Sequence, residues 1–199
     1  MVALDASAGS LVTRLLAAVS AGREEEVAAL LAAGADPNGM DEARLLTPLL
    51  NVAKTAHLGI ARRLLTAGAR LDLANVHGVT PLHWAAAKQK DDMARLFLEA
   101  GASVHAVEHD GWTPLHWASF RGATAMVERF LAAGALIDQP DHDGWTPLHL
   151  AAQQRHLPTV QCLLRHGADP NRRDHDGRRP VDLAAGRGYH ELVAVLGER

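Results

Sequence analysis

The chain has 199 residues, of which 48% are hydrophobic and 22% are charged, and its formal net charge at pH 7 is −3. This composition is ordinary for a folded soluble protein, and so small a net charge does not favour nucleic acid or an anionic membrane. The single cysteine, Cys162, excludes an intramolecular disulfide framework and a cysteine-rich zinc site. No segment approaches the roughly 20 uninterrupted apolar residues of a membrane-spanning helix. We therefore predict a cytoplasmic protein that binds neither nucleic acid nor membrane, and we expect a monomer.

A repeat of 33 residues runs through the chain. The tetrapeptide Thr-Pro-Leu-His begins at residues 80, 113 and 146, and weaker copies begin at residues 47 and 179. A Gly-Ala pair follows the threonine position in four of these units, and the same pair at Gly34-Ala35 defines an earlier unit with Thr13 at the threonine position. A period of this length indicates a stacked repeat array. We predict one domain over residues 1–199 with six units, at approximately 8–44, 45–77, 78–110, 111–143, 144–176 and 177–199.

Each unit is predicted to form a helix, a short turn, a second helix and a hairpin-like loop. Threonine is a favourable N-cap and proline is favoured at the first helical position, so the first helix begins at Thr-Pro. The second helix carries apolar residues at helical spacing, and the glycine of Gly-Ala ends it. The break between the helices is expected near Gln89, Gly122 and Gly188. Asp-Gly before the next threonine predicts a tight turn at the loop tip.

The terminal units and the second unit depart from this pattern. The second unit carries an insertion, Leu45 in place of glycine and Leu50 in place of histidine, which predicts irregular packing there. In the last unit Arg179 and Asp182 replace threonine and histidine, and the chain ends soon after the second helix. Because terminal repeats shield an array from solvent, we expect a complete domain with a capping unit at each end.

The pattern closely resembles the ankyrin repeat family. The resemblance is carried by Asp-Gly-Trp-Thr-Pro-Leu-His at 110–116 and 143–149 and by His-Gly-Ala-Asp-Pro-Asn at 166–171. It implies an all-α solenoid of six helix–turn–helix units with short hairpin loops. It also implies that His83, His116 and His149 each bond to the threonine hydroxyl of the motif and to the backbone of a neighbouring unit.

Other residues invite a catalytic or metal hypothesis. His109, His142 and His175 recur at the loop tips, but we expect neighbouring tips to stand about 8–10 Å apart, as packed helices do, which is too far for zinc coordination. Cys162 and His166 are four residues apart on a predicted helix, but Cys162 falls at an apolar core position, where free cysteine is commonly buried. We predict no catalytic residues, no metal and no cofactor.

Arginines gather near the C-terminal end, where they could suggest binding to phosphate or nucleic acid. Aspartates alternate with them, and the basic run does not continue into earlier units. A solvated, salt-linked end is therefore the favoured interpretation.

Trp112 and Trp145 lie between the Asp-Gly turn and the threonine of their units. The resemblance implies that this position faces the concave groove, together with the residues that end the first helix. Exposed tryptophan and arginine are common interface anchors, although the rings could instead pack between repeats. Trp84 and Trp117 are expected within the helix layer. The candidate partner-binding residues are Trp112, Phe120, Arg121, Trp145, Gln154, His109, Asp110, His142, Asp143 and Arg178.

These features favour a non-catalytic protein–protein interaction module that binds another protein along its concave face. An alternative is a stoichiometric inhibitor or immunity-type protein that occludes the site of a partner enzyme. An enzyme with an unrecognised site is a third possibility, but it lacks a candidate pocket with perturbed ionisable groups.

Overall fold

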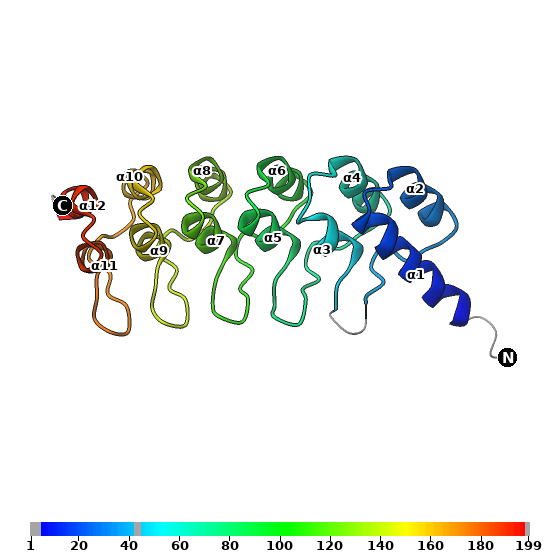
Figure 1. The fold of residues 1–199 in the computed structure, drawn as a ribbon, viewed down its shortest axis with the longest axis horizontal. Helices are drawn as coiled ribbons and strands as arrows, with labels where there is room; N and C mark the ends of the chain where they lie inside the picture. Colours follow the sequence, from blue (N-terminus) through cyan, green and yellow to red (C-terminus); the bar gives the residue numbers. More distant parts are fainter. Residues whose placement is uncertain (1–4, 42–44, 198–199) are drawn as a thin grey trace. The chain divides into compact units, whose positions relative to one another are not determined.

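The computed structural model describes the backbone of residues 5–41 and 45–197, and side chains from residue 11 onward within those ranges. The described residues form twelve α-helices and no β-strand (Figure 1). Two compact units divide these helices, with α1–α6 in Met1–Ser103 and α7–α12 in Val104–Arg199. The helices are α1 (Asp5–Ser20), α2 (Glu24–Ala32), α3 (Pro48–Val52), α4 (Leu58–Thr66), α5 (Pro81–Ala87), α6 (Asp91–Glu99), α7 (Pro114–Phe120), α8 (Thr124–Ala132), α9 (Pro147–Gln153), α10 (Leu157–Arg165), α11 (Pro180–Gly186) and α12 (His190–Gly197).

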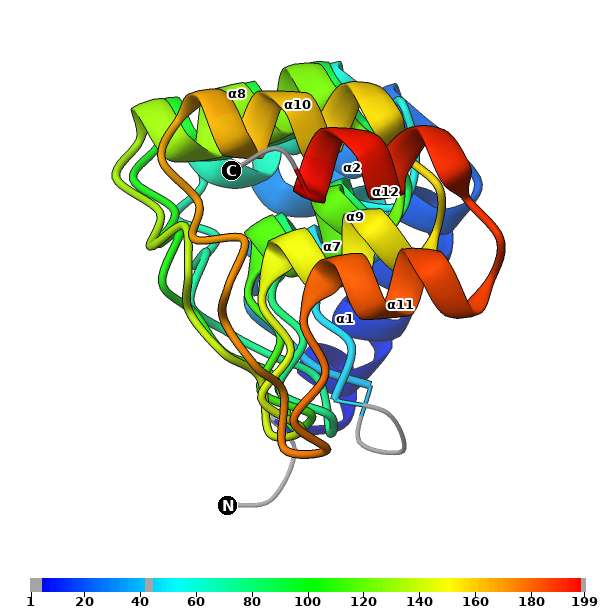
Figure 2. The ribbon, with the colours of Figure 1, turned by 90° about the vertical axis from the view of Figure 1, so that its left-hand side faces the viewer.

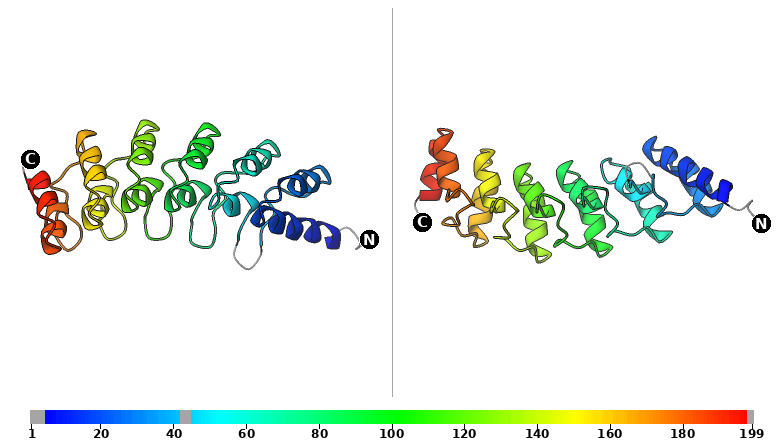
Figure 3. Two further views of the ribbon diagram at one scale, coloured as in Figure 1. Left: turned by 45° about the horizontal axis from the view of Figure 1, so that its top comes forward. Right: turned by 90° about the horizontal axis from the view of Figure 1, so that it is seen from below.

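Each compact unit consists of two layers of helices. In Val104–Arg199, α7, α9 and α11 lie side by side in the first layer, and α8, α10 and α12 form the second (Figure 2). Loops project from the first layer and connect each helix pair to the next (Figure 1). Met1–Ser103 is built in the same way, with α1, α3 and α5 in one layer and α2, α4 and α6 in the other (Figure 3). The predicted all-α solenoid of helix–turn–helix units is confirmed.

The Thr-Pro-Leu-His motif starts the first helix of a repeat and also joins it to the next repeat. The backbone N–H of Thr113 donates to His116 Nδ1 at 3.1 Å, and the Thr113 hydroxyl accepts from the His116 backbone N–H at 3.4 Å. Because Nδ1 is an acceptor, Nε2 carries the proton, and it lies 3.2 Å from the carbonyl oxygen of Trp145. His149 repeats the arrangement with Thr146 and with the Arg178 carbonyl oxygen. The role implied by the family resemblance is confirmed for these two histidines.

The core lies between the two layers. Leu115 and Leu148, which follow the motif proline, are fully buried, and so are Phe97 and Phe130 of the second layer. Alanines of the first layer, such as Ala118 and Ala151, are also fully buried. Their small side chains let successive first-layer helices pack closely, and the area of apolar surface removed from water stabilises each repeat against its neighbours.

The turn between the two helices of a repeat requires a left-handed backbone. Gln89, Gly122 and Gly188 have φ of 53°, 68° and 73°, so the helix breaks fall where they were predicted. Arg155 occupies the same place in its repeat with φ of 61°. At Gly122 a side chain is also excluded by space, because a Cβ atom there would lie 2.5 Å from Nδ1 of His156.

The second repeat is irregular, as its sequence predicted. Its first helix, α3, has five residues, whereas α5, α7 and α9 have seven. Leu50 is fully buried at the histidine position, and an apolar side chain there cannot donate to the next repeat. Leu45 has φ of 49° and is 39% exposed. Residues 42–44, in the connection between Gly34 and Thr47 that is one residue longer than its later counterparts, lie outside the described residues.

The terminal repeats differ from the central ones in separate ways. Helix α1 begins at Asp5 and contains Thr13, so the residue at the threonine position lies inside the first helix of this repeat and does not begin it. Arg14 follows Thr13 where the motif has proline. Because no proline stands there, the helix can continue on the N-terminal side of Thr13. At the other end, Asp182 accepts from the Arg179 backbone N–H at 2.8 Å and from its guanidinium at 3.1 Å. A charged pair thus replaces the neutral threonine–histidine pair.

Candidate functional site

A buried carboxylate organises each loop in the second compact unit. Asp141 is 8% exposed, and its Oδ1 accepts from the backbone N–H groups of Asp143 at 2.9 Å and Trp145 at 2.8 Å. Its Oδ2 accepts from Nε1 of Trp112, at the start of the same repeat, at 2.9 Å. One side chain therefore holds the loop that leads into the next repeat and also fixes the indole that follows the preceding loop.

The same position recurs every 33 residues. Glu108 accepts from the backbone N–H groups of Asp110 and Trp112, both at 3.1 Å. Asp174 accepts from those of Asp176 at 3.0 Å and Arg178 at 2.8 Å. This series of loop-organising carboxylates was not predicted from the sequence, although an acidic residue two positions before each Asp-Gly pair could have indicated it.

The acidity of Asp174 follows from its partners. Burial alone raises the pKa of this carboxyl, but hydrogen bonds from the backbone and guanidinium of Arg178 outweigh burial and hold the pKa below its ordinary value. The side chain is therefore a carboxylate at neutral pH, and it draws Arg178 against the loop.

The loop tips are directly bonded to one another. The backbone N–H of His142 donates to the Asp110 carbonyl oxygen at 3.2 Å, and that of His175 donates to the Asp143 carbonyl oxygen at 3.0 Å. Adjacent tips therefore touch through their backbones, which was not predicted from the sequence, while the spacing of about 8–10 Å between equivalent residues of adjacent repeats stays a prediction. At Gly111, with φ of 86°, a Cβ atom would lie 2.7 Å from the His142 backbone nitrogen.

Three aromatic rings gather over α7. The ring centroid of Trp112 lies 4.8 Å from that of Trp117 and 5.3 Å from that of Phe120, and the Arg121 guanidinium lies 5.5 Å from the Phe120 ring. The structure thus brings together three of the predicted site residues. It also adds Trp117, which the sequence analysis assigned to the helix layer. Trp117 is half-buried, and its buried Nε1 has no hydrogen-bond partner in the described part of the chain.

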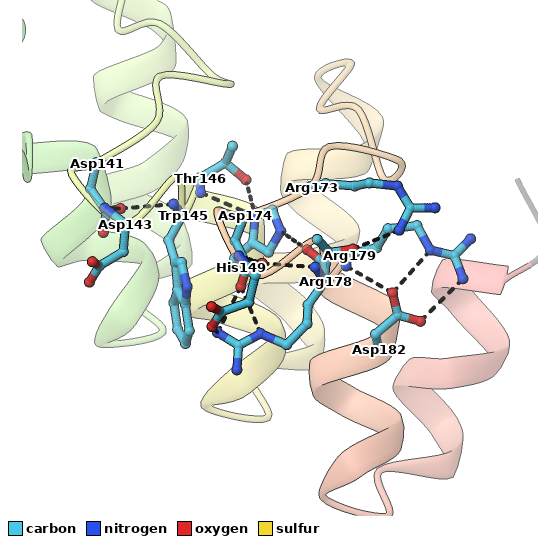
Figure 4. Close-up of polar contacts among 12 residues, drawn as sticks. Asp141, Asp143, Trp145, Thr146, His149, Arg173, Asp174, Arg178, Arg179 and Asp182 are labelled. Atoms are coloured by element: carbon cyan, nitrogen blue, oxygen red, sulfur yellow. Dashed lines mark hydrogen bonds and ion pairs between the residues drawn. The ribbon is translucent and has the colours of Figure 1, made fainter.

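Trp145 lies beside a network of charged side chains (Figure 4). Its ring centroid lies 6.3 Å from the His149 ring and 5.8 Å from the Arg178 guanidinium carbon. Arg178 in turn bonds to Asp174 at 2.9 Å and to Asp176 at 2.6 Å. Both Trp145 and Trp112 are half-buried. Each ring therefore contacts other rings of its own repeat and is neither fully exposed nor fully buried, and a role of either ring in partner binding stays a prediction.

The remaining predicted residues have simpler surroundings. Gln154 caps the C-terminal end of α9, and its side-chain amide donates to Gln153 at 3.2 Å. His109, Asp110, His142 and Asp143 are exposed at the loop tips. Among the described residues, no group of three or more histidine, cysteine, aspartate and glutamate side chains is placed to hold a metal ion.

Cys162 is fully buried on α10, which confirms its predicted core position. Its sulfur lies 3.8 Å from His166 Nδ1 and 3.7 Å from Glu128 Oε1. Burial, with a smaller effect of the Glu128 carboxylate, raises the pKa of the thiol above its ordinary value. Because the thiolate is the nucleophile, burial and the raised pKa both disfavour the reactive form of this cysteine at neutral pH.

A comparison with known protein families identifies the class to which these stacked helix pairs belong. A family model described as ankyrin repeats in three copies matches residues 15–108, 101–174 and 122–199. The chain therefore belongs to the ankyrin repeat family, whose repeats indicate a protein–protein interaction module and whose domains are generally non-catalytic.

Among curated proteins, 64 residues of the chain are 41% identical to part of the E3 ubiquitin-protein ligase KEG of Arabidopsis thaliana. The match covers 32% of this chain and 4% of that protein, so the chain spans only a small part of its relative's length. Among the described residues, no helix combines the length and the apolar character needed to cross a membrane.

Proposed function

We propose that this chain is a non-catalytic module that docks a partner protein on the inner face of Val104–Arg199. The inner face is the one formed by the loops and by α7, α9 and α11, which the family resemblance identifies as concave. We further propose that the chain acts as a single ankyrin domain, as a cytoplasmic monomer, and without nucleic acid, metal or cofactor. The burial of Cys162 and the raised pKa of its thiol support a non-catalytic role.

The observation that carries the proposal is the double anchoring of two half-exposed tryptophans. Asp141 holds the indole of Trp112 by its Nε1 and the backbone of Trp145 by its N–H. Rings that are already fixed lose little conformational freedom when a partner covers them, so more of the contact energy appears as affinity. Tryptophan and arginine are also among the residues most often found as binding hot spots. Arg178 lies beside the Trp145 ring, and Arg121 lies beside Phe120, whose ring contacts that of Trp112.

Affinity capture from a cell extract, read by quantitative mass spectrometry, tests this assignment. The bait is the full chain, and it is compared with Trp145→Ala and with Gln161→Ala, an exposed residue on α10 in the second layer. We expect a defined set of proteins to be retained by wild type and by Gln161→Ala and lost with Trp145→Ala, because an anchor of this kind contributes about 2 kcal/mol or more. Helical circular dichroism checks that each bait is folded. Equal retention by all three baits would contradict the proposed face.

A further inference from the structure

The last repeat shows how a cation is held at a loop tip. Arg178 follows Asp176-Gly177, and its guanidinium reaches two neighbours besides Asp174, to which it bonds at 2.9 Å. It lies 2.6 Å from the Asp176 carboxylate and 5.8 Å from the ring centroid of Trp145 in the preceding repeat. A carboxylate and an indole face thus form a cation-binding pair, in which the charge is neutralised and the flat guanidinium lies over a π-system.

The carboxylates at the equivalent position of the two preceding repeats form no ion pair within the described part of the chain. Asp143 and Asp110 stand one and two repeats before Asp176, in the same Asp-Gly turn, and both are exposed. Tryptophan follows each turn where Arg178 follows the third, so the chain supplies no basic side chain at that position. Among the residues that the structure describes, no lysine, arginine or histidine nitrogen forms an ion pair with either carboxylate.

Trp145 offers a second face beside Asp143. Figure 4 shows His149 and Arg178 on one side of the indole and the Asp143 carboxylate on the other. A cation between Asp143 and this second face would therefore meet a carboxylate of an Asp-Gly turn and an indole, which are two of the three groups that hold Arg178. The Arg178 charge on the first face is balanced by Asp174 and Asp176, which reduces its repulsion of a second cation.

We propose that the loops of Val104–Arg199 bind a basic, extended segment of the partner protein. One arginine or lysine of that segment lies between Asp143 and the face of Trp145 that is turned toward it, and another pairs with Asp110 in the preceding repeat. This inference rests on the proposed function, and it adds the chemistry of the partner. The cationic Arg121 does not oppose it, because Arg121 follows the last residue of α7, at the opposite end of that helix from the loop.

The repeat spacing sets the spacing of the basic residues. Packed helices stand about 8–10 Å apart, so we expect the carboxylates of successive repeats to be separated by about that distance. An extended peptide rises about 3.3 Å per residue, so basic side chains about three positions apart would reach the carboxylates of two adjacent repeats. The expected ligand pattern is Arg/Lys-x-x-Arg/Lys in a segment without regular helix.

Selection from a random 12-residue peptide library displayed on phage, with the immobilised full chain as bait, tests the inference. We expect enrichment of peptides with basic residues about three positions apart. The affinity of an enriched synthetic peptide is then measured by fluorescence polarisation. Asp143→Asn should weaken it two- to fivefold, the range for exposed charge pairs, and Asp110→Asn/Asp143→Asn should weaken it about tenfold. Glu191→Gln, which removes an exposed carboxylate from α12, should leave affinity within twofold.

The outcomes separate this inference from the proposed function. If acidic or apolar peptides are enriched and Trp145→Ala abolishes their binding, the inner face binds protein but the basic partner is wrong. The same conclusion holds if basic peptides bind the double asparagine variant as tightly as wild type. If no peptide is enriched, or if neither the asparagine variants nor Trp145→Ala changes binding, both the inference and the proposed face fail.

Discussion

Asp141 connects two repeats through one buried carboxylate. Its two oxygens accept three hydrogen bonds, and each of the three described partners is an N–H donor, so both oxygens must remain acceptors. A charged acceptor with several backbone donors is stabilised strongly in a partly dry environment, and loss of one hydrogen bond to it costs about 1.5–3 kcal/mol.

Asp141→Asn should therefore destabilise the chain by about 2–4 kcal/mol, since an amide would turn a donor toward Trp112 Nε1 or toward the loop N–H groups. Asp143→Asn is the matched control, because the Asp143 carboxylate is exposed, and it should change stability by less than about 0.5 kcal/mol. Urea unfolding followed by circular dichroism measures both. Equal effects of the two substitutions would show that Asp141 does not organise the loops.

Acid sensitivity should arise from the motif histidines. Burial lowers the pKa of His116 to about 4 from an ordinary 6.5, against weaker opposition from the Trp145 carbonyl oxygen, and burial also lowers the pKa of His149. Between these pH values the unfolded chain binds a proton that the folded chain does not. Protonation of His116 therefore favours the unfolded chain. The free energy of unfolding has its full value above pH 6.5 and decreases as pH falls toward 4.

From about pH 7.5 to pH 5, His116 alone should lower the free energy of unfolding by roughly 2 kcal/mol. Protonation of Nδ1 would also remove the acceptor that caps α7. Urea titrations at the two pH values measure the change, and His116→Gln should show a smaller pH dependence than wild type. A free energy of unfolding that does not change over this interval would contradict the assignment.

At the scale of the helices, the turn within a repeat is the most constrained element. Gly122→Ala should destabilise the chain by about 1–3 kcal/mol, because φ is 68° and the new Cβ atom would meet the His156 ring. Gly186→Ala is the control in α11, where a Cβ atom meets nothing within 4 Å. It should be neutral or stabilise by up to about 1 kcal/mol. Thermal unfolding should give Gly122→Ala the lower melting temperature of the two variants. A lower melting temperature for Gly186→Ala would contradict this prediction.

The helix α3 should be the weakest first-layer helix. It is two residues shorter than α5, and Leu50 cannot form the histidine link to the next repeat. Amide hydrogen exchange should be faster at residues 45–60 than at residues 113–133, since local opening requires fewer hydrogen bonds to break. Equal protection of both segments would contradict this prediction.

Local patterns predicted the elements well, and contacts between repeats were harder to predict. Thr113 and His116 are three residues apart, so their cap is visible in the sequence itself. The bond from Trp112 to Asp141 spans 29 residues and depends on how two loops stack. For the same reason the sequence did not reveal that Trp117 turns toward Trp112, or that the loop tips are bonded to one another.

For the molecule as a whole, the central claim is that a partner covers the inner face of Val104–Arg199. Hydrogen–deuterium exchange with and without the captured partner tests it most directly, because it reports every backbone amide at once. The account predicts slower exchange on binding in residues 108–121 and 141–154, with α8 and α10 unchanged. Slower exchange confined to α8 and α10, or to Met1–Ser103, would contradict it.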